Sequence, residues 1–121
     1  MQVYRQALRF VRLADELRPL VLRRRSSLAD QMDRAADSIV LNIAEGAGEF
    51  AKREKARFYR MARRSATECA GILDILRELK LVDDAKLDVG KQQLLAIVAM
   101  LIGLVKHCEQ RPTPANRIGE A

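Results

Sequence analysis

The 121-residue sequence has no tryptophan, a single histidine and only two cysteines. One imidazole, on His107, is too few for most zinc hydrolase sites or for the Glu-x-x-His repeats of di-iron bundles. Cys69 and Cys108 lie far apart and form no C-x-x-C pair, so the sequence indicates neither a zinc knuckle nor a dithiol redox site. We therefore predict no metal and no cofactor.

Aromatic residues are also scarce, at 4% of the chain, whereas hydrophobic residues make up 49% and charged residues 31%. Alanine, leucine and arginine dominate, a usage that favours helices over strands. The length suits one domain, which we expect over residues 1–111. Pro112 and Pro114 forbid further helix, so residues 112–121 are predicted to be a disordered tail.

Long apolar segments are missing as well. The first residues lack the apolar stretch of a signal peptide. The longest apolar run, residues 94–104, is about half of the ~20 residues that a membrane-spanning helix needs. We expect a cytoplasmic protein that does not contact a membrane.

Apolar residues recur at helical spacing in four segments. The predicted helices cover residues 3–22, 26–45, 52–80 and 88–109. Ser26 or Ser27 is expected to cap the second helix, and Gly46 and Gly48 are expected to end it in a left-handed conformation. Asp83 or Asp88 is placed to cap the fourth helix. Short loops between four helices predict an all-α, antiparallel up-down-up-down bundle.

The fourth predicted helix is apolar around its whole circumference between Leu94 and Val105. A four-helix bundle buries one stripe of each helix, so the other side of this helix needs a different cover. We interpret that side as a subunit interface, which predicts a homo-oligomer. A locally overpacked monomer core is the alternative.

Positive charge is concentrated in residues 52–64, which hold seven basic side chains and one acidic side chain, Glu54. Their net charge of +6 equals the formal charge of the whole chain. Four arginines repeat at i, i+4, i+7 and i+11 and form one helical stripe, and a second, shorter stripe lies on the first helix. The candidate nucleic-acid-binding residues are Arg53, Arg57, Arg60 and Arg64, with Lys52, Lys55 and Arg63 beside them and Arg5, Arg9 and Arg12 in support.

A solvated helix face is the simpler interpretation of such a run. Solvated faces usually mix signs to gain i,i+4 ion pairs, whereas this one places like charges together. The planar guanidinium of arginine also binds phosphate in a bidentate manner. We therefore favour binding to DNA or RNA without sequence specificity, because no helix-turn-helix, zinc finger or RNP motif is present.

The segment RAADSIVLNIAEG, residues 34–46, resembles the signature of the four-helix bundle proteins first met as intervening-sequence proteins of bacterial 23S rRNA genes. The chain is also similar to the accessory variability protein of diversity-generating retroelements. Phe58, Tyr59, Ala62, Ser65 and Glu68 continue the pattern, and the resemblance covers about residues 4–108. It implies a bundle that assembles as a ring-like homopentamer. In the retroelement branch, it implies a basic ring that binds nucleic acid and partners a reverse transcriptase.

Within this signature, polar residues follow one helical stripe beside the apolar one. The stripe consists of Arg34, Ser38, Asn42 and Glu45. We favour a structural polar network, completed from the next helix by Tyr59, Ser65 and Glu68, with Arg34 placed to pair with Glu68. The alternative is an enzyme site at Asn42 and Glu45, but no nucleophile–base pair or convergent acid pair accompanies them.

Two further hypotheses follow from the same residues. Phe58 shares the predicted core face with Met61 and Ala62, whereas Tyr59 lies on another face and is a candidate for stacking on bases. The leading function is a non-enzymatic, nucleic-acid-binding homo-oligomer. The alternative is an interaction scaffold whose basic face docks an acidic protein partner, such as a reverse transcriptase.

Overall fold

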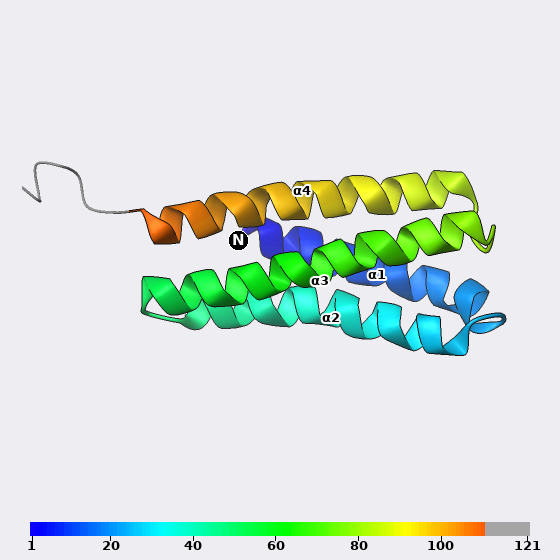
Figure 1. The fold of residues 1–121 in the computed structure, drawn as a ribbon, viewed down its shortest axis with the longest axis horizontal. Coiled ribbons are helices and arrows are strands. Elements are labelled where there is room, and N and C mark those ends of the chain that lie inside the picture. The colour runs from blue at the N-terminus through cyan, green and yellow to red at the C-terminus, as the bar shows by residue number, and fades with distance from the viewer. Residues whose placement is uncertain (111–121) are drawn as a thin grey trace, which may run out of the picture.

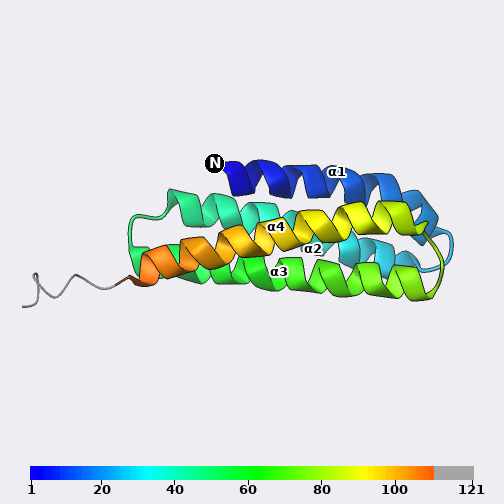
Figure 2. The same cartoon turned by 90° about the horizontal axis from the view of Figure 1, so that it is seen from above.

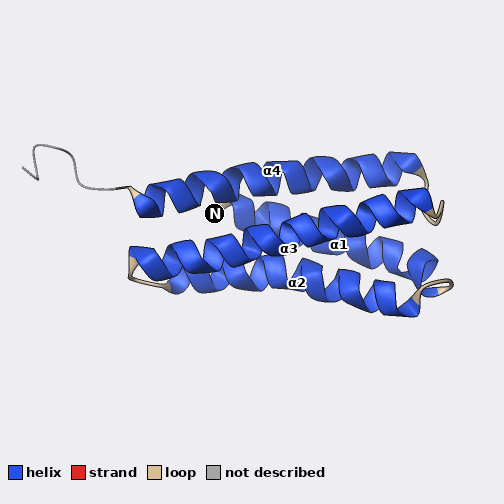
Figure 3. Cartoon of the chain, viewed as in Figure 1, coloured by secondary structure: helices blue, strands red, loops and turns tan. Residues whose placement is uncertain are grey.

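Four long helices and short connections make up the computed structural model, which describes residues 1–110 (Figure 3). The helices are α1 (Gln2–Leu22), α2 (Ser26–Gly48), α3 (Lys52–Glu78) and α4 (Asp84–Glu109). Each helix runs antiparallel to the one before it, so the expected all-α up-down bundle is confirmed (Figure 1). The predicted tail, residues 112–121, lies outside the described residues.

The order of the helices around the bundle determines which surfaces can act together. The main helix contacts are α1 with α2, α2 with α3, α3 with α4, and α4 with α1. Helices α1 and α3 are therefore diagonal to each other, and two perpendicular views place them on opposite sides of the bundle (Figure 2).

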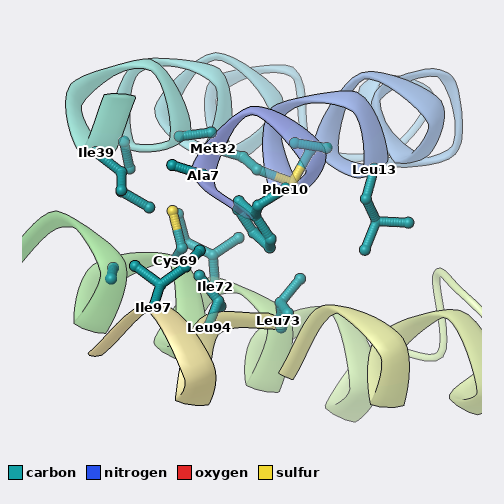
Figure 4. Packing of buried hydrophobic residues seen from close by; sticks show 14 of the residues in the cluster. Ala7, Phe10, Leu13, Met32, Ile39, Cys69, Ile72, Leu73, Leu94 and Ile97 are labelled. Carbon is teal, nitrogen blue, oxygen red and sulfur yellow. The ribbon is translucent and has the colours of Figure 1, made fainter. Parts of the chain in front are cut away.

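The core is continuous along the bundle and is formed by apolar side chains of all four helices (Figure 4). Phe10, Met32, Ile39, Leu73 and Leu94 are among its fully buried members. Among the described residues, no charged or polar residue is classed as buried. Polar chemistry is therefore confined to the surface and to partly buried seams between helices.

Several predicted helix ends differ from the structure. Helix α2 begins after Arg25 without a side-chain cap from either serine, and it continues to Gly48. No described glycine has a positive φ, so the expected left-handed glycine ends are wrong. Helix α4 begins at Asp84 rather than at residue 88, because the carboxylate of Asp83 accepts from the Lys86 N–H at 3.1 Å.

Helix α3 ends at Glu78, two residues earlier than predicted. Lys80 follows in the left-handed region with φ of 56°. The Lys80 N–H donates to the Arg77 carbonyl at 3.1 Å and the Leu81 N–H donates to the Leu76 carbonyl, also at 3.1 Å. This pattern is a Schellman motif in which lysine occupies the usual glycine position.

The core face of α3 is also shifted from the prediction. Tyr59 is buried, with 3% exposed, whereas Phe58 is only partly buried and Met61 is exposed. The reason is the close approach of α2, where Gly46 has no side chain. A Cβ added at Gly46 would lie 2.6 Å from Cε1 of Tyr59. Tyr59 is therefore unavailable for stacking on a base.

Candidate nucleic-acid interface

The four stripe arginines of α3 lie on the side of the helix away from its buried residues. Arg53, Arg57, Arg60 and Arg64 are all exposed. The buried residues Ala56, Tyr59, Ala62 and Ala66 occupy the opposite side. The helical spacing predicted from sequence thus produces a single outward-facing stripe.

Two of these arginines form ion pairs. Arg57 lies 3.0 Å from Glu54 on the same helix, and Arg60 lies 2.9 Å from Glu109 at the end of α4. Arg53 and Arg64 form no ion pair with any residue in the described part of the chain. Arg53 and Arg64 are therefore the stripe residues most available to a ligand.

The other candidates on α3 differ in their surroundings. Lys52 is exposed and Arg63 is partly buried. The ammonium of Lys55 donates to the carbonyls of Gly46 and Ala47 at 3.1 and 3.2 Å. These are terminal carbonyls of α2, so Lys55 stabilises the end of that helix and has a structural role.

The second stripe is separate from the first. Arg5, Arg9 and Arg12 are exposed on α1, on the side away from the core. Because α1 is diagonal to α3 and both stripes lie away from the core, the two stripes face opposite sides of the bundle and do not form one surface within a single chain.

The ends of the bundle differ in charge. We define the basic end as residues 1–7, 38–65 and 100–110, and the balanced end as residues 8–37 and 66–99. The basic end carries nine basic and four acidic side chains, a net charge of +5. The balanced end carries eleven of each. Arg9 and Arg12 belong to the balanced end.

Sequence reasoning missed one exposed aromatic residue at the basic end. Phe50 lies in the connection between α2 and α3 and has 98% of its surface exposed. Nearby, the guanidinium of Arg57 stacks on the ring of Phe58, 4.5 Å from its centroid. The sequence feature that could have identified Phe50 is its position between the end of the second predicted helix and the basic residues 52–64.

The signature polar stripe forms only part of the expected network. The hydroxyls of Ser38 and Ser65 are 2.8 Å apart, and the Asn42 amide donates to the Ser38 carbonyl at 2.9 Å and to its hydroxyl at 3.0 Å. Arg34 and Glu45 are exposed, and the pairing of Arg34 with Glu68 is not formed. Glu68 instead accepts from Gln31 at 3.3 Å.

Neither cysteine joins a reactive cluster. Cys69 is buried, and burial raises the pKa of its thiol to about 12, which keeps it protonated and poorly nucleophilic. Within residues 1–110, no group of three or more His, Cys, Asp or Glu side chains is placed to hold a metal ion.

Two apolar grooves lie on opposite faces of the bundle. One, of about 240 Å³, is lined by α3 and α4 residues that include Ala66, Leu94 and Leu95. The other, also about 240 Å³, is lined by α1 and α2 residues that include Leu8, Val40 and Leu41. Leu95 and Leu41 are 63% and 62% exposed.

Helix α4 is the one described helix that is long and apolar enough to cross a membrane by length and composition. Its 18-residue apolar stretch has a mean hydropathy of 1.5, and 28% of that stretch is buried. The core helix of a soluble protein can have the same length and composition. Helix α4 packs against both α1 and α3. Its remaining apolar side is free to contact another surface.

Comparisons with known proteins identify the fold and the family. A solved structure from Bacteroides thetaiotaomicron, described as a protein with unknown function from the S23 ribosomal protein family, superposes with a TM-score of 0.80. The match covers 86% of this chain and 98% of that one at 19% identity, a level that shows the fold alone. A search of curated proteins finds no match. Residues 1–103 match the family described as 23S rRNA-intervening sequence protein. The chain therefore belongs to the 23S rRNA-intervening sequence protein family.

Proposed function

We propose that this protein is a non-enzymatic, homo-oligomeric nucleic-acid-binding protein that uses the basic end of its bundle. The observation that carries the proposal is the uneven charge: a net +5 at one end and zero at the other. Uneven charge of this kind raises the local potential and attracts polyanions, whereas an even distribution of the same residues would not.

The side chains at this end suit phosphate rather than a small anion. Arg53 and Arg64 are exposed and unpaired among the described residues, and each can donate two parallel hydrogen bonds to a phosphate. Arg57 and Arg60 can exchange their surface carboxylate partners for phosphate at little cost, because exposed ion pairs contribute at most about 1 kcal/mol. Such contacts follow the nucleic-acid backbone and carry no sequence information.

We propose no catalytic role for the signature polar stripe. The Ser38 and Ser65 hydroxyls already bond to each other across the α2–α3 seam, and the Asn42 amide donates to Ser38 within α2. Glu45 is exposed and forms no hydrogen bond with them. The stripe therefore fixes the relative position of two helices.

The assembly proposal depends on the two apolar grooves. A contact between the α3–α4 face of one copy and the α1–α2 face of the next would cover Leu95 and Leu41 together. Head-to-tail contacts of this kind generate a ring if the rotation between copies closes. The family resemblance leads us to expect five copies. A ring would repeat the basic end of every chain around one axis and strengthen its field.

Charge reversal at the two ends tests the proposal. The test variant combines Arg53→Glu and Arg64→Glu. The matched control variant combines Arg23→Glu and Arg24→Glu at the balanced end. Fluorescence anisotropy with a short oligonucleotide should show wild-type affinity falling steeply with salt. The basic-end variant should lose about tenfold in affinity for each arginine. The slope of log affinity against log salt concentration should become shallower by about 2. Light scattering on the same samples should give a mass of several chains.

The control variant should bind like the wild type. Equal losses in both variants, or a salt response that is flat in the wild type, would contradict nucleic-acid binding by the basic end. If the wild type binds no oligonucleotide, the basic end would remain available to an acidic protein such as a reverse transcriptase. A mass of one chain would contradict the proposed assembly.

A further inference from the structure

Phe50 is far more exposed than any other large hydrophobic residue among residues 1–110. Its exposed fraction is 98%, whereas the others in this class lie between 41% and 63%. A phenylalanine left in water forgoes about 1.5–3 kcal/mol of burial free energy. No other large exposed hydrophobic residue adjoins it in sequence, so it is the one large hydrophobic side chain exposed in this connection.

The short segment that carries Phe50 is fixed at both sides. The Glu49 N–H donates to the Gly46 carbonyl at 3.3 Å, and the Lys55 N–H donates to the Ala51 carbonyl at 2.9 Å. The Lys55 ammonium ties α3 to the last carbonyls of α2. The connection is only residues 49–51, so Phe50 lies in the short turn between α2 and α3.

Two cationic residues follow this turn at the start of α3. Lys52 and Arg53 follow within three residues and are both exposed. The turn therefore has an exposed aromatic ring followed in the chain by exposed cationic side chains, the two elements of proteins that bind single-stranded nucleic acid. An unpaired base offers a π-face of matching size, whereas the bases of a duplex are already stacked on both faces.

We propose that Phe50 stacks on an unpaired nucleobase while Arg53 and its neighbours hold the adjoining phosphates. This inference rests on the proposed function and adds to it a ligand class: single strands, loops or ends rather than continuous duplex. Phe50 and Arg53 then have separable roles, because removing the ring changes no charge.

The absence of tryptophan from the chain makes a direct test possible. Phe50→Trp creates a single fluorescent reporter in this turn, and Leu22→Trp creates a control reporter at the balanced end. A single-stranded oligonucleotide should quench Trp at position 50 and leave Trp at position 22 unchanged. An oligonucleotide with abasic sites, a continuous duplex and heparin should bind with little quenching. Equal quenching by duplex or heparin would overturn the inference.

Affinity measurements separate this inference from the proposed function. Phe50→Ala should weaken single-strand binding by about 5- to 100-fold, Phe50→Tyr should retain it, and the salt slope should be unchanged in both. If Phe50→Ala binds like the wild type while the Arg53 and Arg64 variant does not, the stacking inference fails and the proposed function stands. If the wild type binds no oligonucleotide, both fail. A blue shift with anionic vesicles, without quenching by oligonucleotide, would instead identify a membrane surface as the ligand.

Discussion

The basic and balanced ends share one core and differ in what their charged residues do. At the balanced end, Arg18 contacts Asp30 and Asp33, Arg77 contacts Asp84 and Asp88, and Lys91 contacts Asp74. At the basic end, the described residues form two ion pairs, Arg57 with Glu54 and Arg60 with Glu109. Five of the seven ion pairs thus lie at the end without net charge.

This difference indicates that charge stabilises the fold at one end and is left available at the other. The balanced-end pairs join α1 to α2 and α3 to α4. The stripe on α3 instead places arginines at i,i+4 spacing, which costs about 0.2–0.5 kcal/mol for each like-charged pair. The stability of the helix does not account for this spacing, which is why we propose a role in binding for these arginines.

The largest effect we expect on stability comes from the close helix contact at the basic end. In Gly46→Ala, the new Cβ would meet the buried Tyr59 ring at 2.6 Å. Overpacking should outweigh the gain in helix propensity and destabilise the fold by about 1–2 kcal/mol. Chemical denaturation followed by circular dichroism measures the change.

Two other glycines serve as controls for Gly46→Ala. At the balanced end, a Cβ on Gly90 meets the tips of Leu73 and Leu13, at 2.9 and 3.1 Å, which are flexible groups that can move, and Cε1 of Phe10 at an ordinary contact distance of 3.7 Å. Gly48 has nothing within 4 Å. Gly90→Ala should change stability by less than about 0.5 kcal/mol, and Gly48→Ala should be neutral or stabilising by up to about 1 kcal/mol. Destabilisation by Gly48→Ala equal to that by Gly46→Ala would show that contact with Tyr59 is not the cause.

A smaller effect should distinguish the arginines of the two ends. Arg18 donates to two carboxylates of α2, and its hydrogen bond to Asp30 raises the pKa of its guanidinium. Arg18→Gln should lower the melting temperature, by less than Gly46→Ala does. Arg53→Gln should leave it unchanged, because Arg53 forms no ion pair among the described residues. Equal losses in the two variants would remove the distinction between stabilising and available arginines.

The bundle was predictable because helical periodicity is strong in each of four segments. The core face of α3 was predicted correctly at Ala62 and wrongly at Phe58 and Met61, which were favoured because they are larger than the alanines beside them. In the structure Ala56 and Ala66 are buried, and Met61 is 41% exposed. Small residues are buried on that face because α3 packs closely against α2 and α4. The sequence does not show which helices approach closely, so it does not show that alanines are preferred there.

The candidate site was predictable as a charge run but not as a surface. The stripe spacing on α3 was correct, whereas Arg5, Arg9 and Arg12 were expected to support that stripe and instead lie on the diagonal helix. The bond from Lys55 to the end of α2 depends on the angle between two helices. Phe50 was missed because the exposure of a side chain in a turn depends on whether the flanking helices cover it. The residue type alone does not show this.

The most direct test of binding by the basic end compares exposed lysines in the unmodified protein. Lys52 lies at the basic end, and Lys80 and Lys86 lie at the balanced end, all three exposed. Acetylation with and without a short oligonucleotide, followed by mass spectrometry, reports the protection of each. The proposed interface predicts that the oligonucleotide slows acetylation of Lys52 and leaves Lys80 and Lys86 unchanged. Protection of Lys80 and Lys86 equal to that of Lys52, or none at Lys52, would contradict it.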